Sequence, residues 1–335
     1  MATAIAYPVR TPRWILTYQG VNITTDISEM VRSIRYVDEL GGSSGELEVE
    51  LEDRDRRWQG PWLPAQGDAV SLLIGYAGEP LLPCGDFQVD DLELEGPPDV
   101  FHLRCLPAWI TPSLRTRNSF GYENQTVLEI AGVVAARHGM SVVGAAAPLD
   151  AVYDRITQKQ ETDVEFLRRL AREHNYDFTV RGTQLIFYAR ADLEAQAAAL
   201  TLTRAEVERF AFVARTQSIY QQAQTAYFDS LTKQLYAQTA SAAPAVASGD
   251  TLKLVARCEN GQQALARAVA ILHEANRLLV TGRVVAPGTV RLVAGNVAAL
   301  SGWGAMDGNY LVERAAHRLE RERGYVSEAD LRRVS

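Results

Sequence analysis

Apolar and polar residues alternate along the first third of the chain, and this period of two is typical of β-strands. The clearest case is the segment 46–52, in which Leu47, Val49 and Leu51 would face one side and four glutamates the other. Segments of the same kind, separated by glycine and proline turns, predict five more strands, at residues 14–18, 31–37, 69–76, 87–94 and 100–105. Many short strands with regular turns indicate a β-barrel or a β-sandwich.

The period changes to that of a helix after about residue 116. One helix is predicted over residues 125–138, and Gly139 follows it where a C-terminal cap belongs. A second helix is predicted from the capping box of Thr162 and Glu165, whose hydroxyl and carboxylate bind otherwise unpaired backbone amides, to Asn175. The residues expected on the inward face of the first helix are Val127, Ile130, Val133 and Val134.

A hairpin over residues 176–188 completes a small α/β domain, and from about Val207 the strand pattern returns. An alanine- and serine-rich stretch at 237–249 predicts a mobile loop, and an amphipathic helix is expected at 262–276. The inward residues of this helix would be Leu265, Val269 and Leu272. Further strands are expected at 284–285, 290–293, 296–300 and 310–312.

The two β-rich regions resemble each other. Residues 34–37 precede Asp53, and residues 210–213 precede Asp229, by the same spacing and at a constant offset of 176 residues. Two more matches follow in the same order, each beginning with glycine and an Asx residue: 67–72 with 295–300, and 85–90 with 308–313. Such Gly-Asx turns also recur by chance in β-proteins. Three matches in one order nevertheless favour two related β-barrels.

These patterns predict a mainly β chain in which two related, tail-tube-like β-barrel domains flank a small α/β domain. The predicted boundaries are 1–115 for the first barrel, 116–200 for the α/β domain and 201–335 for the second barrel, which carries an inserted loop and helix at 237–276.

Composition and charge narrow the classes of function. The chain has 335 residues, is 47% hydrophobic and 22% charged, and carries a net charge of −7. This balance excludes intrinsic disorder, and an acidic chain argues against a protein that grips nucleic-acid phosphates. No run of eighteen apolar residues exists, so no membrane insertion is expected, and the first residues do not form a secretion signal. We expect the protein to be made and folded in a cytoplasm.

No motif in the sequence predicts catalysis. Residues 41–45 match a Gly-x-Ser-x-Gly pattern, but a nucleophile elbow needs a helix after the serine, and here a strand follows. Residues 302–304 lack the third glycine of a dinucleotide fingerprint and are interpreted as a turn. The histidines are isolated from one another: His102, His138, His174, His273 and His317. We predict no catalytic, cofactor-binding or metal-binding residues and no cofactor.

The three cysteines, Cys84, Cys105 and Cys258, lie far apart in the sequence. Their number and spacing fit neither a disulfide framework nor a metal site, so they are interpreted as small buried hydrophobic residues. A bridge between Cys84 and Cys105 stays open, because both lie in or beside strands of one β-rich region.

The sequence resembles the phage late control D family, the hub proteins of contractile-tail baseplates. It is also similar to the N-terminal part of type VI secretion spikes, the valine-glycine repeat (VgrG) proteins. The segments that carry the resemblance cover most of the chain in family order: 58–75 with a Pro-x-x-Gly-Asp turn, 160–187 with Phe-Leu and Arg-Leu-Ala, 280–302, and 307–325 with "DGNYLVERAAHRLERERGY".

The resemblance implies a structural protein, not an enzyme, that assembles as a homotrimer around a central channel and joins a six-fold tail tube to a three-fold spike. Two barrels in each of three chains would match a hexameric ring while the symmetry stays three-fold. The expected partners are the tail tube protein, the spike protein and other baseplate proteins. The expected location is the tail baseplate of a virion, or a phage-tail-like particle, after synthesis in the bacterial host cytoplasm.

Departures from the relatives shape two further expectations. The chain ends at Ser335, without the additional β-structure of the secretion spikes and without a lysozyme-like insertion. The spike and any wall-cutting enzyme are therefore expected to be separate polypeptides. A hub-associated cell-wall hydrolase and a secretion-spike adaptor remain the alternative functions. The α/β domain, whose second helix has a charged face, is expected on the outside of the ring.

Two predicted strands concentrate carboxylates on one face each: Glu46, Glu48, Glu50 and Glu52 in the first, and Asp91, Glu93 and Glu95 in the second. Alternation alone fits either a solvated face or a channel wall that repels DNA, so that the genome passes without specific binding. On the second interpretation, lysines in place of the four glutamates should leave folding largely intact and create DNA binding.

Overall fold

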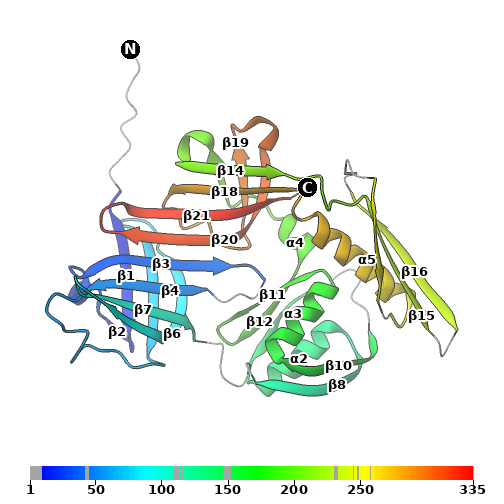
Figure 1. Cartoon of the computed structure of the whole chain (residues 1–335), viewed down its shortest axis with the longest axis horizontal. Coiled ribbons are helices and arrows are strands. Elements are labelled where there is room, and N and C mark those ends of the chain that lie inside the picture. Colours follow the sequence, from blue (N-terminus) through cyan, green and yellow to red (C-terminus); the bar gives the residue numbers. More distant parts are fainter. Residues whose placement is uncertain are drawn as a thin grey trace, which may run out of the picture.

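The computed structural model describes residues 10–41, 45–108, 114, 116–145, 152–229, 233–243, 245–246, 249–256 and 258–334. This part of the chain is mainly β. It contains one sheet of thirteen strands, three smaller sheets and five α-helices. Figure 1 shows the large sheet on one side and the smaller sheets with most of the helices on the other.

The large sheet runs through both β-rich regions of the sequence, in the order β14-β18-β21-β20-β3-β4-β7-β6-β5-β1-β2, with β19 on β20 and β13 on β19. The two regions join where β3 pairs with β20 in antiparallel fashion over seven residue pairs. The strands are β1 (Pro12–Tyr18), β2 (Val21–Asn22), β3 (Val31–Glu39), β4 (Glu46–Glu52), β5 (Ala69–Tyr76), β6 (Leu82–Glu95), β7 (Val100–Pro107), β13 (Leu200–Thr203), β14 (Arg209–Ala214), β18 (Val280–Pro287), β19 (Val297–Ser301), β20 (Gly308–Glu320) and β21 (Gly324–Arg333).

Each β-rich region has its own apolar core on one face of this sheet. Leu47, Val49 and Leu51 of β4 are buried in the first core, as the alternation predicts, while the glutamates between them are only half-buried. Tyr310 and Val312 of β20 are buried in the second core. Burying every second side chain fixes the register of the strands, because a shift by one residue would expose the core.

The two regions repeat one strand order. The first reads β3-β4-β7-β6-β5 and the second β14-β18-β21-β20-β19. Even the irregularities coincide: β6 shifts register against β7 between Val89 and Asp91, and β20 shifts against β21 between Val312 and Arg314. The sequence match of 85–90 with 308–313 aligns these same positions.

The repeat differs from the prediction in one match and ends after five strands. Asp53 follows β4, whose counterpart in the second region is β18, whereas Asp229 ends β15 in another sheet, so these two aspartates do not correspond. Residues 34–37 of β3 and 210–213 of β14 do hold equivalent places in the repeated strand order. The sixth strands also differ, because β1 is antiparallel to β5 and β13 is parallel to β19. That each region closes into a tube-like barrel stays a prediction.

The middle of the chain forms two small sheets covered by helices. Its elements are β8 (Arg117–Gln125), α2 (Val127–Arg137), β9 (Ser141–Gly144), β10 (Tyr153–Thr162), α3 (Asp163–Glu173), β11 (Tyr176–Arg181), β12 (Gln184–Ala189) and α4 (Arg190–Glu194). Both predicted helices and the hairpin are confirmed. Thr126 and Thr162 each form a complete capping box, and Asn175 ends the second helix with a φ of 61°.

The structure of the middle region differs from the predictions in two details. Val133 of α2 is 43% exposed, and Ala131 and Ala135 complete the buried face instead. The pair β8 and β10 was not predicted, because polar residues dominate both strands and leave no clear alternation.

An insertion separates β14 from β18 and forms its own layer (Figure 1). It contains β15 (Gln222–Asp229), β16 (Gln234–Ser241), β17 (Thr251–Val255) and α5 (Gly261–Asn276). The helix is confirmed, although it packs through alanines and Leu272, and Leu265 and Val269 are only half-buried.

The predicted loop and one predicted strand in this half are corrected. Residues 237–241 belong to β16, because small side chains fit the face of the sheet beneath α5. Residues 290–293 form turns between β18 and β19 instead of a strand. Short helical turns complete the described structure at α1 (Thr24–Ile27), η1 (Arg204–Glu206) and η2 (Gly304–Met306).

Candidate functional site

The two acidic strands lie on one face of the large sheet, separated only by β7. Arg104 of β7 is opposite both Glu48 of β4 and Asp91 of β6, and His102 is opposite both Glu50 and Glu93. Residues opposite each other on paired strands share a face. Each row of carboxylates was predicted from the sequence, and the structure joins the two rows into one charged face.

Arginines pair with the glutamates of the β4 row, and these partners were not predicted from the sequence. The guanidinium of Arg35 lies 2.7 Å from Glu48, and that of Arg321 lies 2.7 Å from Glu52. The remaining pairs are Arg32 with Glu50 at 3.1 Å and Arg104 with Glu46. Because these partners come from neighbouring strands, a row of like charge on one strand becomes a mixed-charge surface in the sheet.

The β6 row keeps more of its acidity. Asp91 and Glu95 are about two-thirds exposed, and their nearest cationic partners lie farther away than those of the β4 row. Arg104 is 4.0 Å from Asp91, and His102 is 3.6 Å from Glu95. The charged face is therefore balanced over β3 and β4 and acidic at the end of β6.

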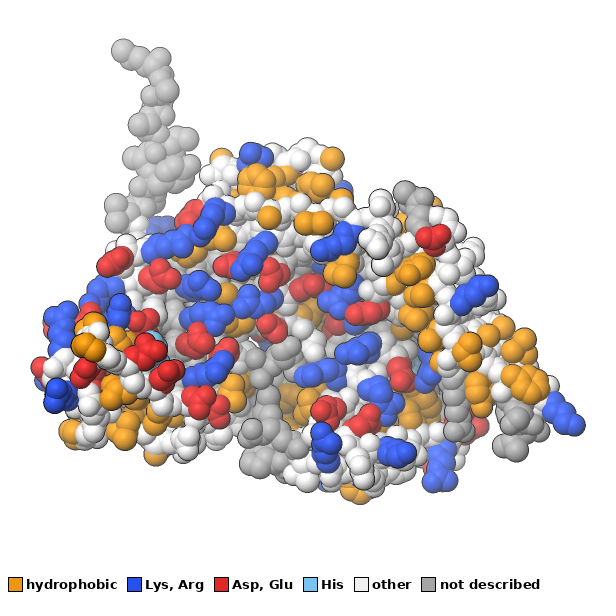
Figure 2. Space-filling model, in the orientation of Figure 1, with side chains coloured by type: hydrophobic (Ala, Val, Ile, Leu, Met, Phe, Trp, Pro, Cys, Tyr) orange, Lys and Arg blue, Asp and Glu red, His pale blue; other side chains and the backbone are white. Residues whose placement is uncertain are grey.

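The same face continues over the second β-rich region. Arg314 of β20 pairs with Glu39 of β3 at 3.0 Å and lies 3.7 Å from Asp330 of β21. Arg283 of β18 pairs with Glu328 and lies 3.8 Å from Asp330. Figure 2 shows acidic and basic side chains interleaved across the layer of β3, β4, β20 and β21. We call this eight-strand surface, from β14 to β6, the charged face.

The charged face is hollowed where its two halves meet. One hollow of about 540 Å³ is lined by residues of β3, β4, β6, β7 and β20, among them Arg35, Glu48 and Glu93. A second hollow, of about 750 Å³, adjoins it and shares Ser33, Glu50 and Glu320. The shape is concave and polar, and no pair of carboxylates is isolated there in apolar surroundings as general acid–base catalysis would require.

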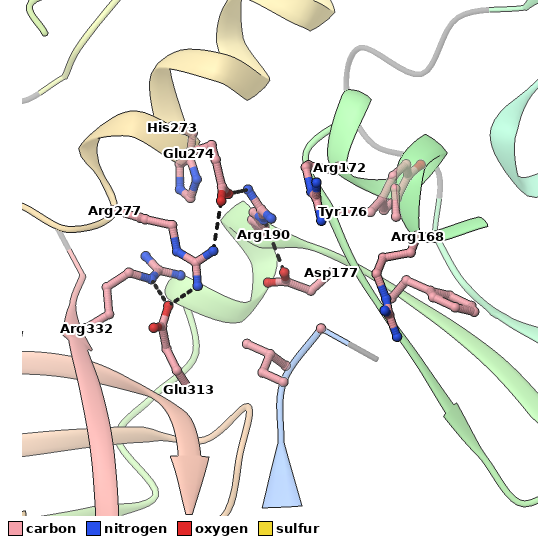
Figure 3. Close-up of a pocket in the computed structure, with 14 residues that line it drawn as sticks. Arg168, Arg172, Tyr176, Asp177, Arg190, His273, Glu274, Arg277, Glu313 and Arg332 are labelled. Atoms are coloured by element: carbon pink, nitrogen blue, oxygen red, sulfur yellow. Dashed lines mark hydrogen bonds and ion pairs between the residues drawn. The ribbon is translucent and has the colours of Figure 1, made fainter. Parts of the chain in front are cut away.

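A second cluster of charges, the ionic junction, connects the middle region, α5 and the second β-rich region (Figure 3). Arg190 of α4 lies between Asp177 at 3.2 Å and Glu274 of α5 at 2.8 Å. Glu313 of β20 accepts from Arg277 at 2.7 Å and from Arg332 at 3.0 Å. Buried ion pairs of this kind favour one relative placement of the elements, because separating them leaves charges unpaired.

Glu194 lies at the centre of the ionic junction. It is bound by His273 at 2.8 Å and by Arg332 at 2.7 Å. Burial alone would raise the pKa of Glu194, but the hydrogen bonds and charges of His273 and Arg332 lower it to about 2. The carboxylate is thus a structural anion at neutral pH, committed to its two partners.

Two of the isolated histidines are buried beside polar groups. His317 is fully buried, with Nδ1 2.7 Å from the Tyr325 hydroxyl and Nε2 3.1 Å from the Leu292 carbonyl oxygen. His174 contacts the Tyr153 hydroxyl at 2.6 Å. Burial lowers the pKa of both imidazoles to about 4. They are neutral packing groups at physiological pH.

The other motifs carry no chemistry in the structure. Cys84, Cys105 and Cys258 are buried free thiols, so the bridge left open between Cys84 and Cys105 is not formed. Burial, with a contribution from the charge of Asp90, raises the pKa of Cys105 to about 12. Residues 302–304 lie in the turn between β19 and β20. Residues 42–44 of the Gly-x-Ser-x-Gly match lie outside the described residues, and a strand does follow them.

Two further kinds of site, for a metal ion and for a membrane, are missing from the described part of the chain. No group of three or more histidine, cysteine, aspartate or glutamate side chains there is arranged to hold a metal ion. None of its helices combines the length and the apolar character that crossing a bilayer requires.

Comparison with known proteins gives the class of this fold. The chain matches the model of the phage tail baseplate hub (GPD) family over residues 99–323. It is 28% identical to the probable baseplate hub protein of Escherichia phage 186 over 213 residues, 62% of this chain and 54% of that protein. The equivalent protein of Escherichia phage P2 is also 28% identical, over 63% of this chain and 54% of its own length. The matches thus span about half the length of these relatives.

Solved structures agree on the fold. A 43 kDa tail protein of prophage MuSo2 from Shewanella oneidensis is 14% identical with a TM-score of 0.73, covering 96% of this chain and 98% of its own. An Escherichia coli component of the type VI secretion system has a TM-score of 0.58 at 14% identity, over 96% of this chain and 77% of its own. The chain belongs to the phage tail baseplate hub family, and the resemblance to baseplate hub proteins is confirmed.

Proposed function

We propose that the protein is the structural hub of a contractile tail baseplate, in which three copies surround a channel and connect a six-fold tail tube to a three-fold spike. The observation that supports this proposal most is the repeated five-strand order within one chain. Three chains would present six similar units to a hexameric ring. The insertion between β14 and β18 occurs in only one of the two repeats. It would therefore be present three times in the assembly, whose true symmetry would be three-fold.

In this proposal the charged face lines the channel. Its concave hollows and its dense, mutually paired charges support that role, because arginines that already have carboxylate partners attract DNA phosphates less than a uniformly basic wall would. The exposed carboxylates of β6 add a repulsive component. DNA would pass without specific binding.

The α/β region would then lie outside the ring, toward other baseplate proteins. It attaches to the second β-rich region through the ionic junction and to β3 through Arg181, which lies 3.3 Å from Asp38. The tail tube protein and the spike protein would contact the two ends of the ring. The proposed location is the tail baseplate of a virion or a phage-tail-like particle.

The assembly is tested by the mass of the purified full chain, alone and with the spike protein. We expect three copies, each burying more than about 1,000 Å² against its neighbours, as a permanent interface does. Light scattering and native mass spectrometry measure the copy number. A stable monomer or a ring of six chains would contradict the proposal. A turbidity assay on bacterial cell walls tests the hydrolase alternative, and we expect no clearing.

A further inference from the structure

The charged face ends in two open strand edges. Within the described chain, β14 pairs only with β18, and β6 beyond Val89, whose backbone bonds to residues 67 and 68, pairs only with β7. Figure 1 shows β14 and β6 at opposite ends of the eight-strand layer. Open edges offer unpaired backbone donors and acceptors to another strand, and proteins usually cover or disrupt them.

The repeat identifies what these edges correspond to. By strand order, β14 is the counterpart of β3, and β6 is the counterpart of β20. In the middle of the chain, β3 and β20 are paired with each other. The two strands that are open at the ends are therefore the repeats of the two strands that join the halves of the chain.

We propose that β14 of one copy pairs in antiparallel fashion with residues 91–95 of β6 in the next copy, so that each junction between chains repeats the β3–β20 junction within a chain. This inference rests on the proposed function and names the surface by which copies associate. A head-to-tail contact of this kind uses two different patches, and it forms a ring when the rotation between copies closes, which the proposed function requires after three copies. The partner is a second copy of this chain. The open strand β14 is the counterpart of β3, the open strand β6 is the counterpart of β20, and β3 and β20 already pair with each other.

The repeat also predicts the register. Within the chain, Arg314 is opposite Glu39 and His317 is opposite Tyr36. In the alignment of the two repeats, each residue of β20 corresponds to the residue of β6 that lies 223 positions earlier. Each residue of β3 corresponds to the residue that lies 176 positions later, in or directly after β14. The corresponding pairs between copies are Asp91 with Arg215 and Leu94 with Phe212.

Charge complementarity is kept in this register although the charges are exchanged. The guanidinium of Arg314 on β20 lies 3.0 Å from the carboxylate of Glu39, the last residue of β3. At the equivalent places β6 has Asp91 and the residue after β14 is Arg215, so acid and base have swapped strands. A chance alignment of two edges would put like charges together as readily as opposite ones.

Apolar exposure at both edges fits the same pairing. Leu94 of β6 is 47% exposed, and Phe210 and Val213 of β14 are 39% and 46% exposed. The predicted register places Leu94 beside Phe212, whose ring already belongs to the second core. Pairing would continue the core across the junction and remove Leu94 and Phe210 from water, whereas Val213 lies on the charged face.

A cysteine pair tests the register directly. Residues opposite each other in an antiparallel pair have Cα atoms about 4.5–5.5 Å apart, within reach of a disulfide. In the full chain with Leu94→Cys and Phe212→Cys, mild oxidation should link most chains into covalent dimers and trimers on a non-reducing gel. The matched control, Leu94→Cys with Val213→Cys, shifts one cysteine to the opposite face and should link less than about a tenth as much. Equal linking in both variants would overturn the proposed register.

A charge exchange tests the same contact without a covalent bond. Asp91→Arg or Arg215→Asp alone should raise the concentration needed for assembly by roughly tenfold or more, since each copy then carries a like-charge pair at its junction. The double variant Asp91→Arg/Arg215→Asp should restore assembly. Both residues are exposed, so folding should be unaffected, and circular dichroism checks it.

The outcomes separate this inference from the proposed function. A three-copy mass with no specific cross-link and no rescue by the double variant would overturn the edge pairing alone and leave the hub proposal standing. A chain that stays monomeric at every concentration and with the spike protein would overturn both. Cross-linking with rescue supports the β14–β6 contact.

Discussion

His317 shows how a single buried residue ties stability to pH. Its imidazole is fully buried, and burial lowers its pKa to about 4, from about 6.5 in an unfolded chain. The unfolded state therefore binds more protons than the folded state between these two pH values. The contribution of His317 to stability is complete above about pH 6.5 and is lost as the pH falls toward about 4. At pH 5 we expect about 2 kcal/mol less stability from this residue.

The comparison of His317→Gln with the wild type by urea unfolding at pH 7 and pH 5 checks this expectation. The variant should show a smaller loss of unfolding free energy between the two pH values. His102→Gln, a change at a half-exposed histidine on the same large sheet, should leave the loss as in the wild type. A loss unchanged in His317→Gln would contradict the assignment.

Glu194 ties stability to pH in a more acidic range than His317 does. Its pKa, lowered to about 2 against burial by His273 and Arg332, lies below the unfolded value of about 4.3. Its contribution is therefore present above about pH 4.3 and lost as the pH falls toward 2. Glu194→Gln should reduce the unfolding free energy at pH 7 by roughly 2–3 kcal/mol. The unfolding free energy of the variant should also fall less than that of the wild type between about pH 4.3 and about pH 2.

Thermal and urea unfolding at pH 7, 4 and 2.5 measure this effect. Glu123→Gln, a change at an exposed glutamate of β8, serves as control and should remain within about 0.5 kcal/mol of the wild type. If both variants behave alike, the ionic junction contributes no more than surface charge does.

At the scale of elements, the capping box of Thr162 is the feature read most directly from the sequence. The hydroxyl accepts from the Glu165 amide at 3.1 Å, and the Glu165 carboxylate accepts from the Thr162 amide at 2.9 Å. Thr162→Ala should destabilise the chain by about 1 kcal/mol. Thr157→Ala, at an exposed position on the neighbouring strand β10, should change little, and urea unfolding with amide exchange of α3 distinguishes the two.

Local patterns predict elements, and this is why β4, β5, α2 and α3 could be found from the sequence. The patterns that predict these elements depend only on residues within one helical turn or one strand. The strands β8 and β15 were missed because polar or alanine-rich segments gain their order from the sheet that they join. Pairing partners far apart in the chain, such as β3 and β20, leave no local pattern.

The charged face illustrates the same limit at a candidate site. The glutamates of β4 could be placed on one side of a strand from their spacing alone. Their arginine partners lie on other strands or in the turn after β20, and only the folded sheet places Arg35 beside Glu48 and Arg321 beside Glu52. The sequence carries single arginines in these segments, but no local pattern connects them with the glutamates.

These ion pairs also change the expected result of replacing the β4 glutamates with lysine. Each lysine would face a guanidinium that now has a carboxylate partner, so the four changes together should destabilise the sheet rather than leave folding intact. A test of the channel must therefore use acids without close partners.

For the whole molecule, Glu93 and Glu95 of β6 supply that test. Both are exposed and lie on the charged face, and the proposed pairing places them opposite Val213 and Ala211, so lysines there add no repulsion between copies. If the charged face lines the channel, Glu93→Lys/Glu95→Lys places six new cations inside a trimer, and DNA entering the ring meets counter-charge on all sides.

We expect the assembled variant to bind duplex DNA in a mobility-shift assay at low salt, with an affinity that falls steeply as salt rises. In a complete particle it should slow the passage of the genome. The control variant Glu123→Lys/Asp154→Lys makes the same change in net charge on exposed positions of the α/β region, which the proposal places outside the ring. Because net charge alone would affect both variants equally, stronger binding by the first indicates a DNA path along the charged face. Equal binding, or binding by the control alone, would place the DNA path elsewhere.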